Sequence, residues 1–124
     1  METLQEALDY AHLRNSRVYV TLNTLLDDDE LMDAVEVALS AYQMGVDAFL
    51  VQDKGLASYL AMHFPQIPLH ASTQMTITNE AGVEFAAAHG ISRIVLAREA
   101  ALGDVTDLCA AAKEHNIGIE IFVH

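Results

Sequence analysis

The chain alternates between two kinds of segment, and this alternation constrains its fold more than any other feature. Five short runs rich in β-branched and aliphatic residues have the composition of strands: 17–23, 48–53, 69–73, 93–98 and 118–124. Between them lie segments whose apolar residues recur at helical spacing: 4–11, 31–42, 56–60 and 105–112. Strands that begin roughly 20 to 30 residues apart are typical of successive β-α units. The alternation therefore predicts a single α/β domain over residues 1–124 with a parallel sheet.

A weak internal repeat supports this interpretation. The segments 44–51, 89–96 and 115–122 resemble one another, and each consists of a helix end, a turn and a strand. Gly45 and Gly90 mark the helix ends in the first two copies. The acidic run 27–30 predicts a helix start, with Asp27 and Glu30 as partners in a capping box.

The two faces of the predicted strands distinguish two parallel architectures. In the first strand one face is aliphatic and the other polar or aromatic, with Val18, Val20 and Leu22 against Tyr19, Thr21 and Asn23. The last strand repeats this split. An open doubly wound sheet, the alternative, carries helices on both faces and is apolar on both. One aliphatic face favours a TIM-like barrel, with helices outside and polar side chains within.

Five strands are too few to close the usual eight-stranded barrel. The final strand, 118–124, also has no loop or helix after it. We therefore expect the chain to be a truncated part of a larger barrel domain. Exposed sheet edges in such a piece predict self-association, so we expect a homo-oligomer.

Composition narrows the choice of partners. Eighteen acidic residues against six Lys and Arg give a formal net charge of −12, which repels phosphate backbones. RNA contact is therefore expected only through regions outside this chain.

The single cysteine permits no internal disulfide and no cysteine-based metal site, and Cys109 is predicted to be a buried, inert thiol. No signal peptide or membrane span is visible, which predicts a soluble cytoplasmic protein without a membrane partner.

Candidate site residues lie at the carboxyl ends of the predicted strands, where β-α folds gather their working groups. Six of them are predicted to bind substrate: Asn23, Gln52, Ser72, Gln74, Arg98 and Glu99. Three are predicted to be catalytic: His70, Glu120 and His124. The four other histidines fall at predicted helix ends, where the helix dipole explains them. Capping of loops and helices is the alternative role for all nine residues, and the turn 72–76 is either substrate-facing or self-bonded.

Several of these segments together resemble a known family. They include Tyr19-Val20-Thr21-Leu22-Asn23, His70-Ala71-Ser72-Thr73-Gln74-Met75 and the stretch 93–99. In order and spacing they are similar to the collagenase-like peptidases, family U32, over essentially the whole chain. The closing residues Glu120, Phe122, Val123 and His124 resemble the opening of that family's signature, which continues into a cysteine-containing loop.

The resemblance implies a barrel-like fold and two divergent activities. It implies that the intact protein is a peptidase acting on a protein or peptide substrate, by a mechanism that is unassigned in the family. Other members support iron–sulfur-dependent, oxygen-independent hydroxylation of RNA bases or of the ubiquinone ring. Their cluster cysteines have no counterpart here, so a cluster is expected only in the intact protein and no cofactor within this chain. A third possibility is that the isolated piece is an inactive folding and oligomerisation module.

Overall fold

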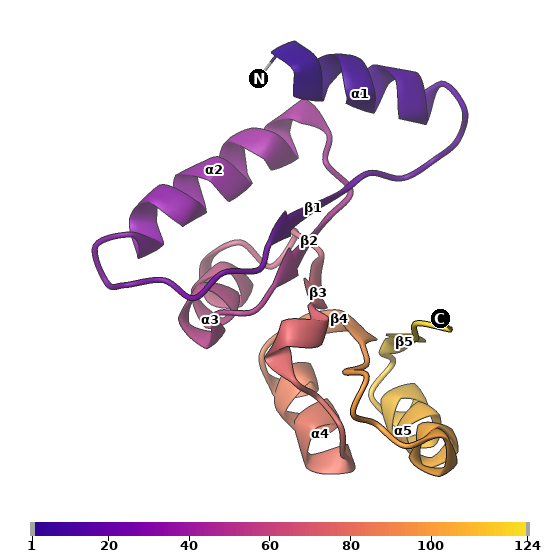
Figure 1. The fold of residues 1–124 in the computed structure, drawn as a ribbon. Helices are drawn as coiled ribbons and strands as arrows, with labels where there is room; N and C mark the ends of the chain where they lie inside the picture. Colours follow the sequence, from indigo (N-terminus) through magenta and orange to yellow (C-terminus); the bar gives the residue numbers. More distant parts are fainter. Residues whose placement is uncertain (1, 124) are drawn as a thin grey trace.

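A computed structural model describes residues 2–123, with the side chain of Glu2 left out, and shows alternating strands and helices (Figure 1). The strands of this part of the chain are β1 (Tyr19–Leu22), β2 (Ala48–Val51), β3 (Leu69–Ala71), β4 (Ile91–Val95) and β5 (Gly118–Glu120). Its helices are α1 (Glu2–His12), α2 (Leu31–Met44), α3 (Lys54–His63), α4 (Glu80–Ala88) and α5 (Leu102–Glu114), with a short 3₁₀ helix, η1 (Thr73–Met75).

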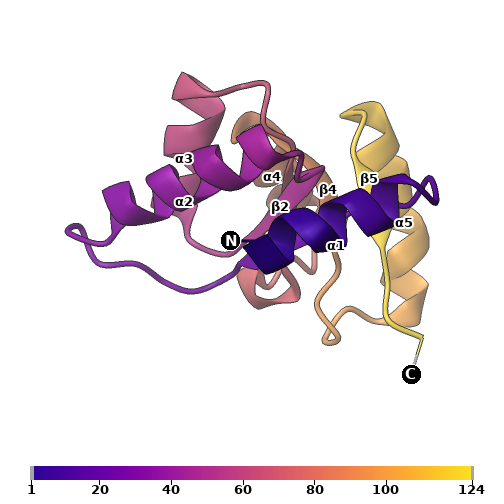
Figure 2. The same cartoon turned by 90° about the horizontal axis from the view of Figure 1, so that it is seen from above.

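The strand order confirms the barrel-like prediction and excludes the doubly wound alternative. All strands are parallel, and their order in the sheet is β1-β2-β3-β4-β5, the same as in the sequence. A doubly wound sheet reverses its order at a switch point, which requires helices on both faces. Right-handed crossovers that always step in one direction place every connecting helix on the same face. Figures 1 and 2 show α2 to α5 along one side of the curved row of strands.

The two faces of the sheet have different environments, as the strand pattern predicts. Phe49, Val51, Leu69 and Ile94 point toward the helices and are fully buried in the hydrophobic core. Burying a side chain of this size stabilises the fold by about 1.5–3 kcal/mol. The inner face is mixed: the strand register aligns Leu50 with His70 and places His70 beside Arg93 on it.

Local sequence signals mark the starts and ends of helices. Gly45 adopts φ +111° after α2, and the Asp27 backbone N–H donates to the Glu30 carboxylate at 3.0 Å, so half of the predicted capping box forms. Asn79 caps α4, accepting from the Gly82 N–H at 2.9 Å, although the periodicity did not single out this helix. Within residues 2–123, no helix combines the length and apolar character that a membrane crossing requires.

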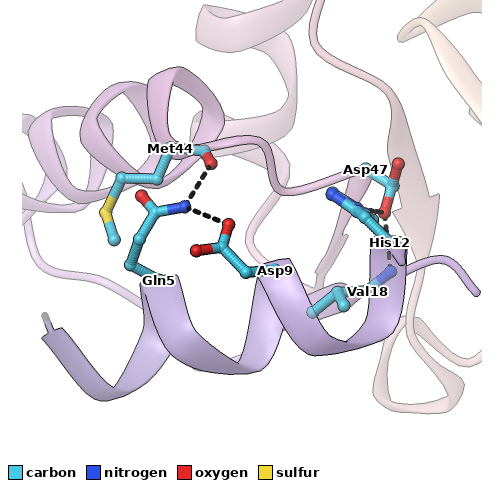
Figure 3. A network of polar contacts seen from close by, with 6 residues as sticks. All are labelled: Gln5, Asp9, His12, Val18, Met44 and Asp47. Carbon is cyan, nitrogen blue, oxygen red and sulfur yellow. Dashed lines mark hydrogen bonds and ion pairs between the residues drawn. The ribbon is translucent and has the colours of Figure 1, made fainter. Parts of the chain in front are cut away.

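A polar network ties α1 to the start of the sheet (Figure 3). The Asp47 carboxylate accepts from the Val18 N–H at 2.6 Å and lies 2.9 Å from the His12 ring. The Val18 hydrogen bond is the main cause that lowers the pKa of Asp47 below its usual value, with His12 and Arg17 adding to it against the opposing effect of burial. His12 lies at the helix end, as predicted, but its ring also makes this contact with Asp47.

Candidate functional site

Three predicted substrate-binding residues meet in one cleft at the carboxyl edge of the sheet. This carboxyl-edge cleft has a volume of about 300 Å³ and is lined by Thr73, Gln74, Thr76, Arg98, Glu99 and Phe122. The lining comes from the segments that follow β3, β4 and β5. Parallel strands bring these distant segments to one edge, which explains how Gln74 meets Arg98 and Glu99.

The first wall of the cleft is a turn held by its own hydrogen bonds. The Ser72 hydroxyl accepts from the Gln74 N–H at 3.4 Å at the start of η1, and Ser72 is only 3% exposed. Thr76 closes the turn in the left-handed conformation (φ +56°), and its hydroxyl donates to the Gln74 carbonyl at 3.3 Å. The turn is therefore self-bonded, and since it also lines the cleft, its substrate-facing role stays a prediction. Ser72 positions the turn, while the Gln74 side chain lines the cleft.

The opposite wall combines a cation with an aromatic ring. The Arg98 guanidinium carbon lies 5.1 Å from the centre of the Phe122 ring, within cation–π range. Phe122 is 51% exposed. A second cavity of about 300 Å³, mostly apolar, adjoins the cleft and shares both residues, with Leu102, Val105 and Ile121 among its lining. Together these groups offer a flat apolar surface beside an amide, a carboxylate and a guanidinium, which suits a planar polar ligand.

His70 lies away from this cleft, in a position that differs from the sequence prediction. It is inside β3 rather than at its end, because the strand continues to Ala71. It lines a separate cavity of about 370 Å³, the inner-face cavity, whose charged and polar lining comprises Arg17, Tyr19, Asp47, His70, Ser92 and Arg93. Arg17 and Asp47 precede β1 and β2, and Tyr19 begins β1, so the cavity lies toward the amino ends of the strands.

The electrostatic setting of His70 makes it a weak base. Burial, and then the charges of Arg93 and Arg17, lower the pKa of His70 to about 4. A general base works best with a pKa near the operating pH, so a neutral imidazole of this kind accepts protons poorly at pH 7. Within residues 2–123 no hydrogen bond joins His70 to Ser72, and no serine nucleophile–base pair forms there.

The remaining predicted residues are dispersed. Asn23 and Gln52 are half-buried at the ends of β1 and β2 and do not line the carboxyl-edge cleft. Glu120 ends β5 with a half-exposed side chain, 4.0 Å from an Arg93 nitrogen. His124 lies outside the described residues. The catalytic roles of His70, Glu120 and His124 stay predictions.

The residues present do not fit an iron–sulfur cluster. Such clusters are held by several cysteine thiolates, and this chain has one cysteine. Within residues 2–123 no three His, Cys, Asp or Glu side chains come close enough to hold a metal ion. Cys109 is exposed, so the prediction of a buried thiol is wrong. The buried face of α5 runs through Leu108 and Ala112, and one residue past Leu108 rotates the side chain by about 100° toward solvent.

Sequence reasoning assigned no role to several residues that shape these cavities. Phe122 entered only through the family signature, and Tyr19, Arg17 and Arg93 were not singled out. Strand alternation contained part of the signal, because it places Tyr19 and His70 on the polar face; their ring centres lie 4.8 Å apart, edge to face. The pairing of Arg98 with Phe122 had no local signal, since it joins two loops.

Known proteins resemble the chain in both sequence and fold. The 23S rRNA 5-hydroxycytidine C2501 synthase of Escherichia coli is 39% identical over all 124 residues, which cover 18% of that protein. The tRNA hydroxylation protein P of Helicobacter pylori is 34% identical over the whole chain and 29% of its own length. The chain thus spans less than a third of either relative.

A solved structure and a family model complete the comparison. The structure of the U32 peptidase Mk0906 matches 95% of this chain and 49% of its own, with a TM-score of 0.68 at 18% identity, which shows a shared fold. The model of peptidase family U32 matches residues 1–124, the whole sequence. The resemblance read from the sequence is therefore confirmed, and this chain belongs to peptidase family U32.

Proposed function

We propose that the complete protein hydroxylates a base of ribosomal or transfer RNA. The observation that carries this proposal is the match along the entire chain, at 39% identity, to an enzyme named for hydroxycytidine synthesis in ribosomal RNA. Further relatives are named for hydroxylation of transfer RNA. Peptide hydrolysis, the first expectation from the family name, has less support, since the relatives of 39% and 34% identity are named for RNA hydroxylation instead.

The carboxyl-edge cleft has the chemistry that base recognition requires. Proteins hold unstacked RNA bases by stacking them on aromatic rings or guanidinium planes and by hydrogen bonding to their edges. Phe122 and Arg98 supply the stacking surfaces, and the Gln74 amide and Glu99 carboxylate supply donors and acceptors. A volume of about 300 Å³ lies at the small end of ligand pockets and suits one base.

The charge of the chain limits its part in RNA binding. A formal charge of −12 opposes contact with the phosphate backbone, so this segment is proposed to receive the base while basic regions elsewhere in the protein hold the strand. The iron–sulfur cluster that the family resemblance implies is likewise placed outside residues 1–124, where several cysteines would be needed.

Nucleoside mass spectrometry of cellular RNA tests this proposal. Cells that lack the gene are expected to lose one hydroxylated pyrimidine from ribosomal or transfer RNA, and the complete gene product is expected to restore it. Cleavage of casein and gelatin by the same purified product is the matched assay for peptidase activity. Unchanged RNA together with gene-dependent proteolysis would overturn the proposal in favour of peptide hydrolysis.

A further inference from the structure

The inner-face cavity gathers positive charge in an acidic chain. Two of the six Lys and Arg residues, Arg17 and Arg93, line this one cavity of about 370 Å³, although the chain carries a net charge of −12. The cavity lies at the amino ends of the strands, away from the carboxyl-edge cleft.

The local backbone gives Arg93 room to lie across the sheet. A Cβ atom on Gly118 would lie 3.4 Å from the Arg93 Nε and 3.7 Å from its Cγ, so the side chain of Arg93 passes directly over this glycine of β5. The nearest carboxylate within residues 2–123 is that of Glu120, 4.0 Å away, which is too far for a direct hydrogen bond. Arg93 thus pairs loosely with Glu120, while no side-chain hydrogen bond within residues 2–123 uses its N–H donors.

The rest of the lining leaves donors facing the cavity. Arg17 makes no ion pair within the part of the chain described, and its side chain is exposed. His70 is 6% exposed, and no hydrogen bond within residues 2–123 involves its ring nitrogens. Within the same residues no buried side-chain nitrogen or oxygen lacks a hydrogen-bond partner, so solvent reaches the unpaired ring nitrogens of His70 and a ring N–H can be donated to a ligand in the cavity.

The one carboxylate in the lining is already committed. Asp47 directs the same oxygen to the Val18 N–H and to the His12 ring, which ties its charge to α1 (Figure 3). The lining itself therefore carries two guanidinium groups and one carboxylate, and a second carboxylate, that of Glu120, lies 4.0 Å from Arg93 outside the lining. Paired arginines with an imidazole and a phenol nearby are the groups that proteins use to bind phosphate and carboxylate oxygens.

We propose that the inner-face cavity binds a small oxyanion, a phosphate or a carboxylate, between Arg17 and Arg93, with His70 donating one ring N–H to it. This site is separate from the carboxyl-edge cleft, and it does not depend on the proposed RNA hydroxylation. Guanidinium groups bind both kinds of oxyanion through parallel N–H donors, so the two sources share one chemistry.

Calorimetric titration of the protein in chloride buffer tests the site with two probes, inorganic phosphate and malonate. We expect a dissociation constant of millimolar or below for at least one probe, and the probe with the lower dissociation constant identifies the class of oxyanion. Arg17→Gln and Arg93→Gln are each expected to weaken binding roughly tenfold or more, as the loss of a charge-assisted contact implies. The matched control is Arg14→Gln, because Arg14 stacks on Tyr10 of α1, away from the cavity; its binding should equal that of the unmodified protein.

The ring resonances of His70 give a second readout. A bound anion offsets the charges of Arg17 and Arg93, which help to lower the pKa of His70, so that pKa is expected to rise when phosphate or malonate is added. Arg17→Gln keeps the test decisive should Arg93→Gln fail to fold, since Arg17 is exposed. Failure of both probes to bind, or equal binding by the Arg17 variant, would overturn the proposal.

Discussion

At the scale of single residues, His70 shows how position within a strand decides chemistry. The sequence suggested a histidine at the mouth of a barrel, and strand ends predicted from composition are uncertain by a few residues. In the structure the same ring is buried on the inner face beside Arg93. Burial and nearby positive charge both favour the neutral imidazole.

This setting predicts an acid-sensitive stability. The pKa of His70 is lowered from 6.5 to about 4 in the folded protein, so below pH 6.5 the unfolded chain binds a proton that the folded chain does not. Stability is then expected to fall from pH 6.5 to pH 4, by up to about 3 kcal/mol, since each pH unit in this window is worth about 1.4 kcal/mol. His70→Gln removes the titrating group. Urea unfolding in chloride buffer should show a flatter pH profile for this variant, and identical profiles would contradict the argument.

At the scale of secondary-structure elements, some glycines occupy positions that no other residue fits, whereas others could be replaced by alanine without a clash. Gly90 links α4 to β4 with φ +75°, and a Cβ atom there would lie 2.7 Å from the Ala61 Cβ. Gly90→Ala is therefore expected to destabilise the fold by about 2–4 kcal/mol, through backbone strain and overpacking. The matched control is Gly103→Ala in the first turn of α5, where a Cβ meets nothing within 4 Å. This change should stabilise by roughly 0.5–1 kcal/mol. The measurement is the denaturant midpoint of unfolding for each variant and for the unmodified protein. Equal midpoints for Gly90→Ala and Gly103→Ala would contradict the argument.

Elements were predictable where the signal was local. Alternating periodicity placed all the strands that the structure describes, because each β-α unit carries its own apolar pattern. The boundaries were less accurate: β4 begins at Ile91 rather than at 93, and β5 ends at Glu120 although its predicted run continued to 124. Hydrogen bonding to a neighbour decides where a strand ends, and that neighbour lies far away in the sequence.

At the scale of the whole molecule, the carboxyl ends and the amino ends of the strands carry different chemistry. The carboxyl edge has an aromatic ring, a guanidinium, an amide and a carboxylate, whereas the amino end of the inner face gathers two arginines and a histidine. The sequence predicted that Gln74, Arg98 and Glu99 share one edge, since parallel strands require it. It could not predict the Arg98–Phe122 contact, which depends on the path of two loops. Self-association through the sheet edges stays a prediction.

The central claim is that the carboxyl-edge cleft receives an RNA base, and Phe122 is its most direct test. The measurement is the hydroxylated fraction of ribosomal and transfer RNA pyrimidines in cells whose only copy of the complete gene carries Phe122→Ala. Loss of a stacking surface worth about 1–3 kcal/mol predicts a fall of roughly tenfold. Val123→Ala is the matched control, because Val123 is exposed next to Phe122 but does not line the cleft, and it should leave the modification unchanged. Full hydroxylation with Phe122→Ala, at normal protein levels, would contradict the claim.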